Sequence, residues 1–325
     1  MTDPVEYADA LEKARLGEAL DAREAGAVAA QLPRRLLEIM STASFVRERG
    51  GSAPFTCGII NAKSGRCAED CRFCAQSAVY PAATPVHPLV PEENLFRRAC
   101  FLAETGADYM GIVCSGVGPT PKDFERILKA AERITREAGI RLCASIGVLS
   151  LEQTRQMKEA GFTSVHHNLE SARSFFPSVC STHGYDARLE TARNAKAAGL
   201  RLCCCGIFGL GESWEQRLEL SETIKELDVD SIPLNFLNPI PGTPLSDRQM
   251  LSASEALGII AVMRLMHPRR DILVCSGRTT VLAGWENAIF FAGANGFMLG
   301  DYLTLRGNPL EKDLGILRTL GLRTG

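Results

Sequence analysis

From about residue 55 onwards, short apolar runs rich in β-branched residues alternate with longer stretches of helical, amphipathic period. The apolar runs predict eight strands, and the stretches between them predict helices that mostly end in Ala-Gly or Thr-Gly. A glycine directly after a helix suits the left-handed cap that turns the chain into the next strand. The predicted strands are FTCGIIN, YMGIVCS, RLCASIG, SVHHNLE, RLCCCGIFG, SIPLNFL, DILVCSG and GFMLG.

Strands that alternate regularly with helices predict an α/β fold, and eight of them predict a closed (β/α)8 barrel of the TIM type. An open, doubly wound sheet is the alternative. The segment before the first strand is charged and helical in pattern. We therefore divide the chain into an N-terminal helical extension at residues 1–45 and a barrel with a C-terminal extension at residues 46–325.

The composition permits a large core, because 46% of the 325 residues are hydrophobic and 23% are charged. A net charge of −2 gives no reason to expect nucleic acid or an anionic membrane as a partner. The amino terminus lacks the basic start and apolar run of a secretory signal, and no run of about 18 apolar residues follows. We expect a soluble, cytoplasmic protein.

Twelve cysteines are many for such a chain, and disulfides are rare in reducing compartments. Metal binding or redox chemistry is therefore the first hypothesis. Cys67, Cys71 and Cys74 share one loop after the first predicted strand, and three thiolates can hold a four-iron cluster while one iron stays open. A structural zinc site would need a fourth protein ligand, which the neighbouring sequence lacks. The isolated cysteines, which we expect to be small apolar residues, include Cys57, Cys100 and Cys180.

Polar residues cluster where several predicted strands end. Asn168 and Glu170 end SVHHNLE, Asn235 lies in SIPLNFL, and Arg278 follows DILVCSG. Taken alone, either asparagine could simply satisfy buried backbone groups. Because chemistry in barrels gathers at the carboxyl ends of the strands, their common location predicts a single site beside the cysteine loop.

The Cys-x3-Cys-x2-Cys spacing resembles the signature of the radical S-adenosylmethionine (SAM) enzymes. The segments CAEDCRFCAQSAVY, LCASIGVLSLEQ, HHNLESARSFFPSVCSTHGYDARLET, LNFLNPIPGTPL and CSGR resemble the biotin synthase family. The resemblance extends from about residue 55 to residue 320. It implies that SAM binds the open iron and is cleaved to a 5′-deoxyadenosyl radical, which abstracts hydrogen from dethiobiotin. Sulfur from an auxiliary iron–sulfur cluster then closes the ring of biotin.

The resemblance also implies roles for individual residues. Cys67, Cys71 and Cys74 would hold the radical-generating four-iron four-sulfur cluster. Glu170 stands where the family usually has aspartate. The implied contacts to SAM are Phe73, Ile112, Asn168, Glu170 and Ile207, and those to dethiobiotin are Asn168, Asn235 and Arg278.

The auxiliary cluster departs from the family pattern of three cysteines and one arginine. Cys143, Cys203 and Arg278 match that pattern, but Tyr109 stands in place of the third cysteine. A phenol is a poor substitute for a soft thiolate. The familiar ligand set is therefore incomplete, and the chain must complete it from elsewhere.

Replacement ligands are predicted from the alternation of side chains along a strand. Cys205 is expected to face the lumen with Cys203, while Cys204 faces outward. Cys205 and Cys275 could instead be small packing residues. The predicted auxiliary ligands are Cys143, Cys203 and Cys205, with Cys275 or Arg278 as the fourth, and the cluster type is left open.

Two alternative functions remain: another radical SAM barrel enzyme, such as a maturase or mutase, and a noncatalytic iron–sulfur protein. The first usually lacks the inner cysteines, and the second needs only a cluster near its surface. The family resemblance further implies a flavodoxin or ferredoxin as electron donor, and a homodimer. The nuclearity of the auxiliary cluster and the source of sulfur for its rebuilding are open at this stage.

Overall fold

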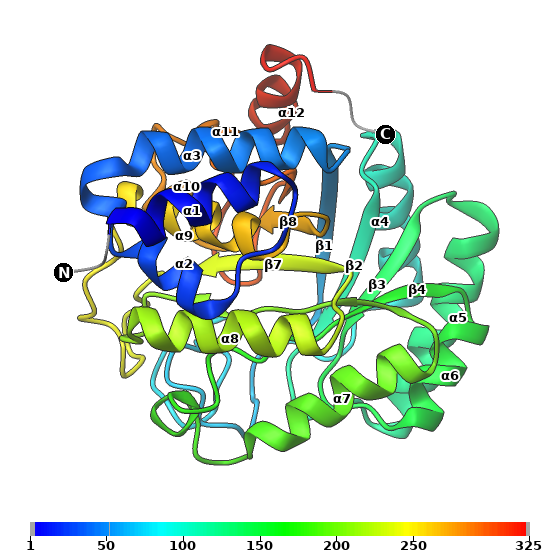
Figure 1. The fold of residues 1–325 in the computed structure, drawn as a ribbon. Coiled ribbons are helices and arrows are strands. Elements are labelled where there is room, and N and C mark those ends of the chain that lie inside the picture. Colours follow the sequence, from blue (N-terminus) through cyan, green and yellow to red (C-terminus); the bar gives the residue numbers. More distant parts are fainter. Residues whose placement is uncertain (1–3, 52, 323–325) are drawn as a thin grey trace.

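The computed structural model describes residues 4–51 and 53–322, and within them eight parallel strands close into a barrel (Figure 1). Around the barrel the strands follow the order β5-β4-β3-β2-β1-β9-β8-β7, and Cys203 of β5 pairs with Ser231 of β7 to close it. The short strand β6 (Ile207–Phe208) continues past the end of β5 and pairs with β7. The prediction of a (β/α)8 barrel is confirmed. The barrel strands are β1 (Phe55–Lys63), β2 (Tyr109–Cys114), β3 (Arg141–Ser145), β4 (Phe162–His166), β5 (Arg201–Cys203), β7 (Ser231–Phe236), β8 (Asp271–Val274) and β9 (Gly296–Met298).

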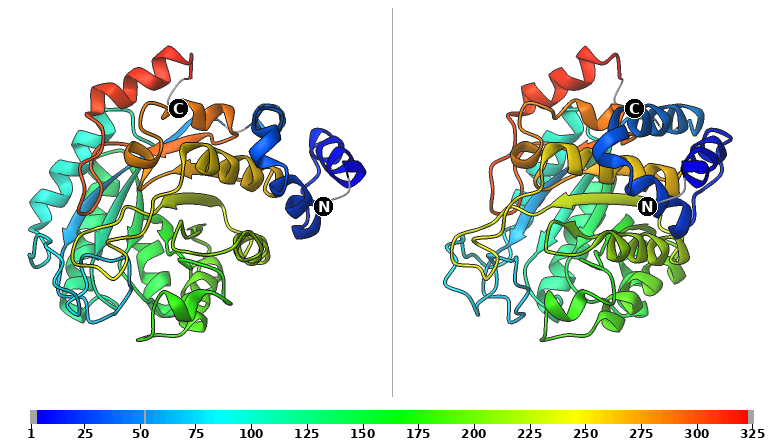
Figure 2. Two further views of the ribbon diagram at one scale, coloured as in Figure 1. Left: turned by 90° about the vertical axis from the view of Figure 1, so that its left-hand side faces the viewer. Right: turned by 60° about the vertical axis from the view of Figure 1, so that its left-hand side comes forward.

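Helices cover the outside of the barrel, as Figure 2 shows from two further sides. Several begin at the caps that their sequences provide, for example the serine capping boxes at Ser150 and Ser213. Gly139 and Gly161 follow helices at positive φ, as the Ala-Gly endings predict. The barrel helices are α4 (Glu92–Glu104), α5 (Pro121–Glu137), α6 (Leu151–Glu159), α7 (Tyr185–Ala197), α8 (Trp214–Glu226), α9 (Ala253–Met266), α10 (Arg278–Val281), α11 (Ala288–Phe291) and α12 (Leu310–Thr319), with a 3-10 turn at Phe176–Ser178.

The predicted N-terminal extension consists of the helices α1 (Pro4–Arg15), α2 (Ala22–Ala29) and α3 (Leu32–Arg49). Helix α3 packs along α9, and α2 packs against α8 and α9, so the extension forms a further layer on that side of the barrel. Helix α3 continues past residue 45, where we placed the boundary, and that division of the chain stays a prediction.

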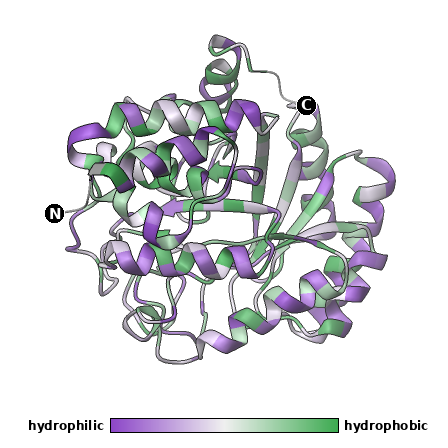
Figure 3. Ribbon diagram, in the orientation of Figure 1, coloured by the Kyte–Doolittle hydropathy of each residue, from purple (hydrophilic) through white to green (hydrophobic). Residues whose placement is uncertain are grey.

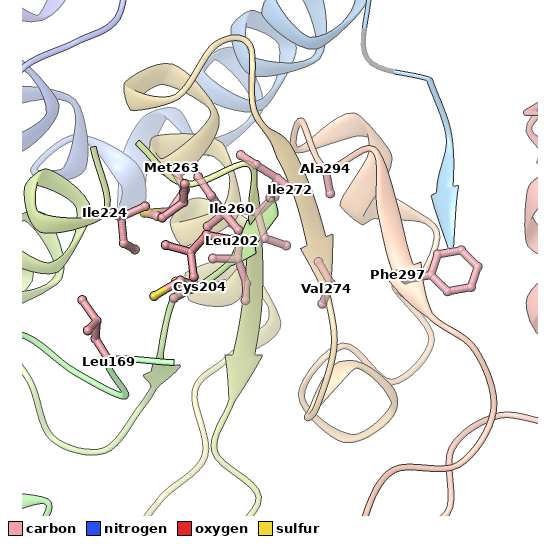
Figure 4. Packing of buried hydrophobic residues seen from close by; sticks show 14 of the residues in the cluster. Leu169, Leu202, Cys204, Ile224, Ile260, Met263, Ile272, Val274, Ala294 and Phe297 are labelled. Carbon is pink, nitrogen blue, oxygen red and sulfur yellow. The ribbon is translucent and has the colours of Figure 1, made fainter. Parts of the chain in front are cut away.

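The core lies between the strands and the helices, where Figure 3 shows mostly hydrophobic ribbon on the strands and purple on the outward helix faces. Helix α9 is buried along almost its whole length, because the barrel lies on one side of it and α3 on the other. Figure 4 shows Ile260 and Met263 of this helix beside Leu202 and Cys204. Among the described helices, none combines the length and the apolar character needed to cross a membrane.

Candidate functional site

A cavity of about 320 Å³ occupies the lumen of the barrel. Every barrel strand contributes to its lining, and so does the loop that follows β1. On most strands the lining residues alternate, as with Cys57 and Ile59 of β1 or Gly111 and Val113 of β2, because successive side chains point to opposite faces. The inward-facing side chains of the strands therefore form the wall of the cavity.

The cysteine loop folds back on itself beside this cavity. The backbone amide of Cys67 donates to the carbonyl of Gln76 at 3.0 Å, and the amide of Cys74 donates to that of Cys71 at 2.9 Å. Cys74 lines the cavity and Cys71 is buried. Burial raises the pKa of both thiols, so metal binding here must displace protons.

A second thiol and an imidazole lie beside Cys71. The ligand atoms of Cys71, Cys180 and His183 are all within 4.8 Å of one another. Both ring nitrogens of His183 are already engaged, because Nδ1 lies 2.5 Å from a Glu69 carboxylate oxygen and Nε2 accepts from Arg188 Nε at 3.0 Å. The group therefore orders the loop rather than offering a free metal site.

Two asparagines that the sequence singles out both line the cavity. Asn168 Oδ1 accepts from the amide of Cys205 at 3.2 Å. Asn235 Oδ1 accepts from the amide of Ser276 at 3.2 Å, and its Nδ2 donates to the carbonyl of Gly206 at 3.2 Å. Both residues satisfy buried backbone groups, and each carbonyl oxygen keeps one lone pair for a ligand.

Glu170 presents a partly unsatisfied carboxylate to the cavity. Its Oε1 accepts from Arg188 Nη1 at 3.4 Å, whereas Oε2 is buried and has no hydrogen-bond partner among the described residues. Burial raises the pKa of this carboxyl group. A buried acceptor without a donor is costly unless a ligand supplies one, so this atom fits a hydroxyl-bearing ligand.

Of the three apolar residues predicted to contact SAM, the structure places two on the cavity wall. Phe73 and Ile207 line the cavity and pack with Leu237. The prediction for Ile112 was wrong: its side chain is fully buried in the core outside the lumen, and its neighbours Gly111 and Val113 line the cavity instead. Strand alternation decides this, since Ile112 has the opposite parity to the lumen-facing positions of β2.

Four thiols line the cavity inside the barrel: Cys57, Cys143, Cys203 and Cys275. The adjacent Cys275 thiol, together with burial, holds the pKa of Cys57 well above its usual range. Burial, and then the nearby Cys143 thiol, raise the pKa of Cys203. Burial raises the pKa of Cys143 to about 12. The four sulfurs therefore lie in the same cavity, contributed by β1, β3, β5 and the end of β8.

Cys57, which we expected to be a small apolar residue, packs in a hydrophobic cluster with Cys275 and Met298, and it also lines the cavity. In the parallel register of β1 and β2 it lies opposite Tyr109, the position where the expected cysteine is missing. The neighbouring strand thus brings a thiol close to the place where β2 lacks one. The signal in the sequence was the alternation of Cys57 with Ile59 along a strand.

Cys205 was wrongly predicted to face the lumen. Strand β5 ends at Cys203, so the alternation that the prediction assumed does not continue. Cys205 is fully buried in the surrounding core and does not line the cavity. Cys204 also lies in that core, as predicted, beside Leu202 (Figure 4).

Arg278 does not line the cavity either, contrary to its predicted role as a ligand and substrate contact. Its side chain is fully buried at the start of α10, where Nη2 donates to Asp313 Oδ1 at 2.7 Å and to the carbonyl of Met298 at 3.3 Å. The guanidinium also lies 4.4 Å from the ring centroid of Phe297. The buried carboxylate of Asp313 on α12 draws the charge away from the lumen.

Comparisons with known proteins show which family the chain belongs to. Residues 62–234 match the radical SAM superfamily, and residues 233–323 match the biotin and thiamin synthesis associated domain. A biotin synthase of Nitratidesulfovibrio vulgaris (strain DP4) is 53% identical over 308 residues, covering 94% of this chain and 85% of the relative. A biotin synthase of Pelobacter propionicus is 47% identical over 311 residues and covers 95% of each chain.

Solved structures resemble the chain in fold. A methylornithine synthase superposes with a TM-score of 0.84 at 20% identity, covering 97% of this chain and 96% of that one. The FeFe-hydrogenase maturase HydG from Carboxydothermus hydrogenoformans superposes with a TM-score of 0.82 at 18% identity, covering 98% and 79%. At these identities the likeness speaks for the barrel alone, so it gives no support to a maturase or mutase activity.

Proposed function

Because the chain belongs to the biotin synthase family of radical SAM enzymes, we propose that its lumen houses that family's reaction, the insertion of sulfur into dethiobiotin to form biotin. The observation that carries the proposal is the single cavity that extends from the cysteine loop to the four inner thiols. A saturated carbon offers no acidic proton, so the reaction needs a radical and a nearby sulfur. A lumen that both cysteine groups border suits that requirement, whereas an electron carrier needs no such cavity.

Cys67, Cys71 and Cys74 are the residues that would hold the radical-generating cluster. Three thiols without a fourth cysteine suit a four-iron cluster with one open iron. When bound, the cluster and SAM supply the 5′-deoxyadenosyl radical. The chain contributes the binding groups: Glu170 Oε2 is free to accept from a ribose hydroxyl, and Phe73 and Ile207 offer apolar surface to the adenine.

Cys57, Cys143, Cys203 and Cys275 are the residues that would hold the auxiliary cluster, in place of the ligand set predicted from the sequence. Four thiolates suit iron–sulfur clusters of two or four irons. Burial keeps these groups protonated in the absence of metal, so cluster loading must release protons. The set needs no arginine, and Arg278 Nη2 is bound to Asp313.

Asn168 and Asn235 would orient dethiobiotin between the two clusters. Each has a carbonyl oxygen with spare acceptor capacity, which suits the N–H groups of the ureido ring. Their fixed hydrogen bonds to backbone amides hold the side chains in place before the substrate arrives. The remaining lining is largely apolar and keeps water away from the radical.

Three family expectations complete the proposal: a homodimer, a flavodoxin or ferredoxin as electron donor, and a cytoplasmic location. Size-exclusion chromatography with light scattering tests the first. Reduction of the anaerobic enzyme by each donor, followed by SAM cleavage, tests the second.

The ligand set is tested with Cys57→Ala and Cys275→Ala, with Cys205→Ala as the matched control. We expect each of the first two variants to lose auxiliary-cluster iron and sulfide after anaerobic purification, while Cys205→Ala keeps the wild-type content. If both lumen variants kept full iron and Cys205→Ala lost it, the assignment would be wrong. Dethiobiotin-dependent cleavage of SAM by the wild type tests the activity itself, and its absence would refute the proposed function.

A further inference from the structure

The four inner thiols have two unlike surroundings. On one side, Cys57 and Cys275 lie against Leu273, Met298, Ile59 and Tyr302, which are apolar apart from the Tyr302 hydroxyl. On the other side, hydrogen-bonding groups surround the sulfurs. The hydroxyls of Ser164 and Ser231 lie beside Cys143 and Cys203, respectively. The lumen is therefore electrostatically asymmetric around these thiols.

His166 is a further polar group on that second side. It is the last residue of β4, pairs with Cys203 across the sheet, and lines the cavity. Its Nδ1 lies 3.4 Å from Cys203 Sγ. The next residue, His167, is buried and does not line the cavity, as expected from the opposite parity of its side chain.

We propose that His166 is a positioning residue that donates its Nδ1–H to the Cys203 thiolate and thereby raises the reduction potential of the auxiliary cluster. A thiolate that binds iron has no proton to give, so a hydrogen bond to it can run only from the imidazole. Hydrogen bonds to cluster sulfurs are among the factors that set the potential of an iron–sulfur centre. The inference rests on the proposed auxiliary ligand set.

The chemistry of sulfur insertion gives this hydrogen bond a purpose. A carbon radical brings one electron and a sulfide brings a lone pair, and the new C–S bond uses two of these three electrons. An iron–sulfur cluster held by these thiols would supply an acceptor for the third electron, once for each of the two C–S bonds. A donor at Cys203 would favour the reduced state of that cluster.

The test compares His166→Leu with His166→Gln, and uses His167→Leu as the matched control. The readout is the potential of the auxiliary cluster, followed by electron paramagnetic resonance during an anaerobic redox titration. We expect His166→Leu to shift the potential in the negative direction, His166→Gln to restore most of the wild-type value through its amide N–H, and His167→Leu to leave it unchanged. A wild-type potential in a fully loaded His166→Leu variant would overturn the inference.

A second readout covers the case in which His166→Leu does not load its cluster. Wild-type protein grown with 15N-labelled histidine should show nitrogen coupling to the reduced auxiliary cluster, and this coupling should vanish in His166→Gln but persist in His167→Gln. Wild-type protein without such coupling would refute the inference. Iron analysis separates this result from failure of the proposed auxiliary site. If that site were wrong, the wild type would contain no second cluster, or Cys203→Ala would keep the wild-type iron content.

Discussion

Replacing Asp313 with alanine should destabilise the protein by about 3–5 kcal/mol, the usual result of breaking a buried ion pair from one side. Both Asp313 and Arg278 have fully buried side chains. Asp313 Oδ1 accepts from Arg278 Nη2 at 2.7 Å and from Asn308 Nδ2 at 3.1 Å, while Oδ2 accepts from the amide of Gly300 at 3.2 Å. The substitution leaves three buried donors without their acceptor.

The expected cost is large because Arg278 has few other partners. Its Nε and Nη1 already lack hydrogen-bond partners among the described residues, and only the Met298 carbonyl would still accept from Nη2. Domains of ordinary stability unfold at a cost of about 5–15 kcal/mol, so the variant would lose a substantial part of the total. Asp313→Asn keeps an acceptor oxygen but loses the charge, and it should therefore fall between the wild type and Asp313→Ala.

Urea denaturation of the cluster-free protein, followed by circular dichroism, measures these differences. The double variant Arg278→Met/Asp313→Leu replaces the pair with apolar groups of similar size and should lie much closer to the wild type than Asp313→Ala. Two results would contradict the reasoning: a loss below about 1 kcal/mol in Asp313→Ala, which a solvent-exposed pair would give, or a double variant as unstable as the single one.

Three further predictions concern other parts of the barrel. Burial lowers the pKa of His267 to about 3, so only the unfolded state gains its proton as the pH falls below about 6.5. Between pH 7 and pH 5 the His267→Gln variant should therefore lose about 2 kcal/mol less stability than the wild type. Parallel profiles of stability against pH for the two proteins would refute this. In Gly206→Ala the new Cβ would lie 2.5 Å from the Glu170 carbonyl oxygen, so thermal denaturation should show a loss of about 1–3 kcal/mol, and an unchanged midpoint would show that the contact relaxes freely. Glu170→Gln should bind SAM about 10-fold or more weakly in anaerobic equilibrium dialysis, because a charged acceptor is lost, and wild-type affinity would exclude this carboxylate as the ribose contact.

The sequence was sufficient for the barrel because its signal is repeated eight times, in apolar runs separated by capped helices. It was also sufficient to place Asn168 and Asn235 on the cavity wall, because residues at the ends of neighbouring parallel strands must converge. It was not sufficient to decide which cysteines face the lumen. Strand parity decides whether a cysteine faces the lumen, and parity fails where a strand stops early, as β5 does before Cys205.

Two other errors have different physical causes. Arg278 carries a long side chain, and its direction depends on a carboxylate 35 residues further along the chain, which no local pattern reveals. Ile112 was taken from a family resemblance, which places a segment correctly but leaves the orientation of a side chain undecided. Cys57 could have been found from the alternation in FTCGIIN, had Tyr109 prompted a search of the adjacent strand.

Because the two cysteine groups border one lumen, the order in which their clusters can be assembled is restricted. The three-cysteine loop follows the carboxyl end of β1, whereas Cys57 lies near the start of that strand, so on β1 the inner thiol lies deeper in the lumen than the loop. A cluster and a nucleotide held at the loop would narrow the route to the inner thiols. Iron and sulfide are thus most easily delivered to the inner thiols before the loop is occupied. Restoring them after each round of synthesis requires that the nucleotide and the product leave beforehand.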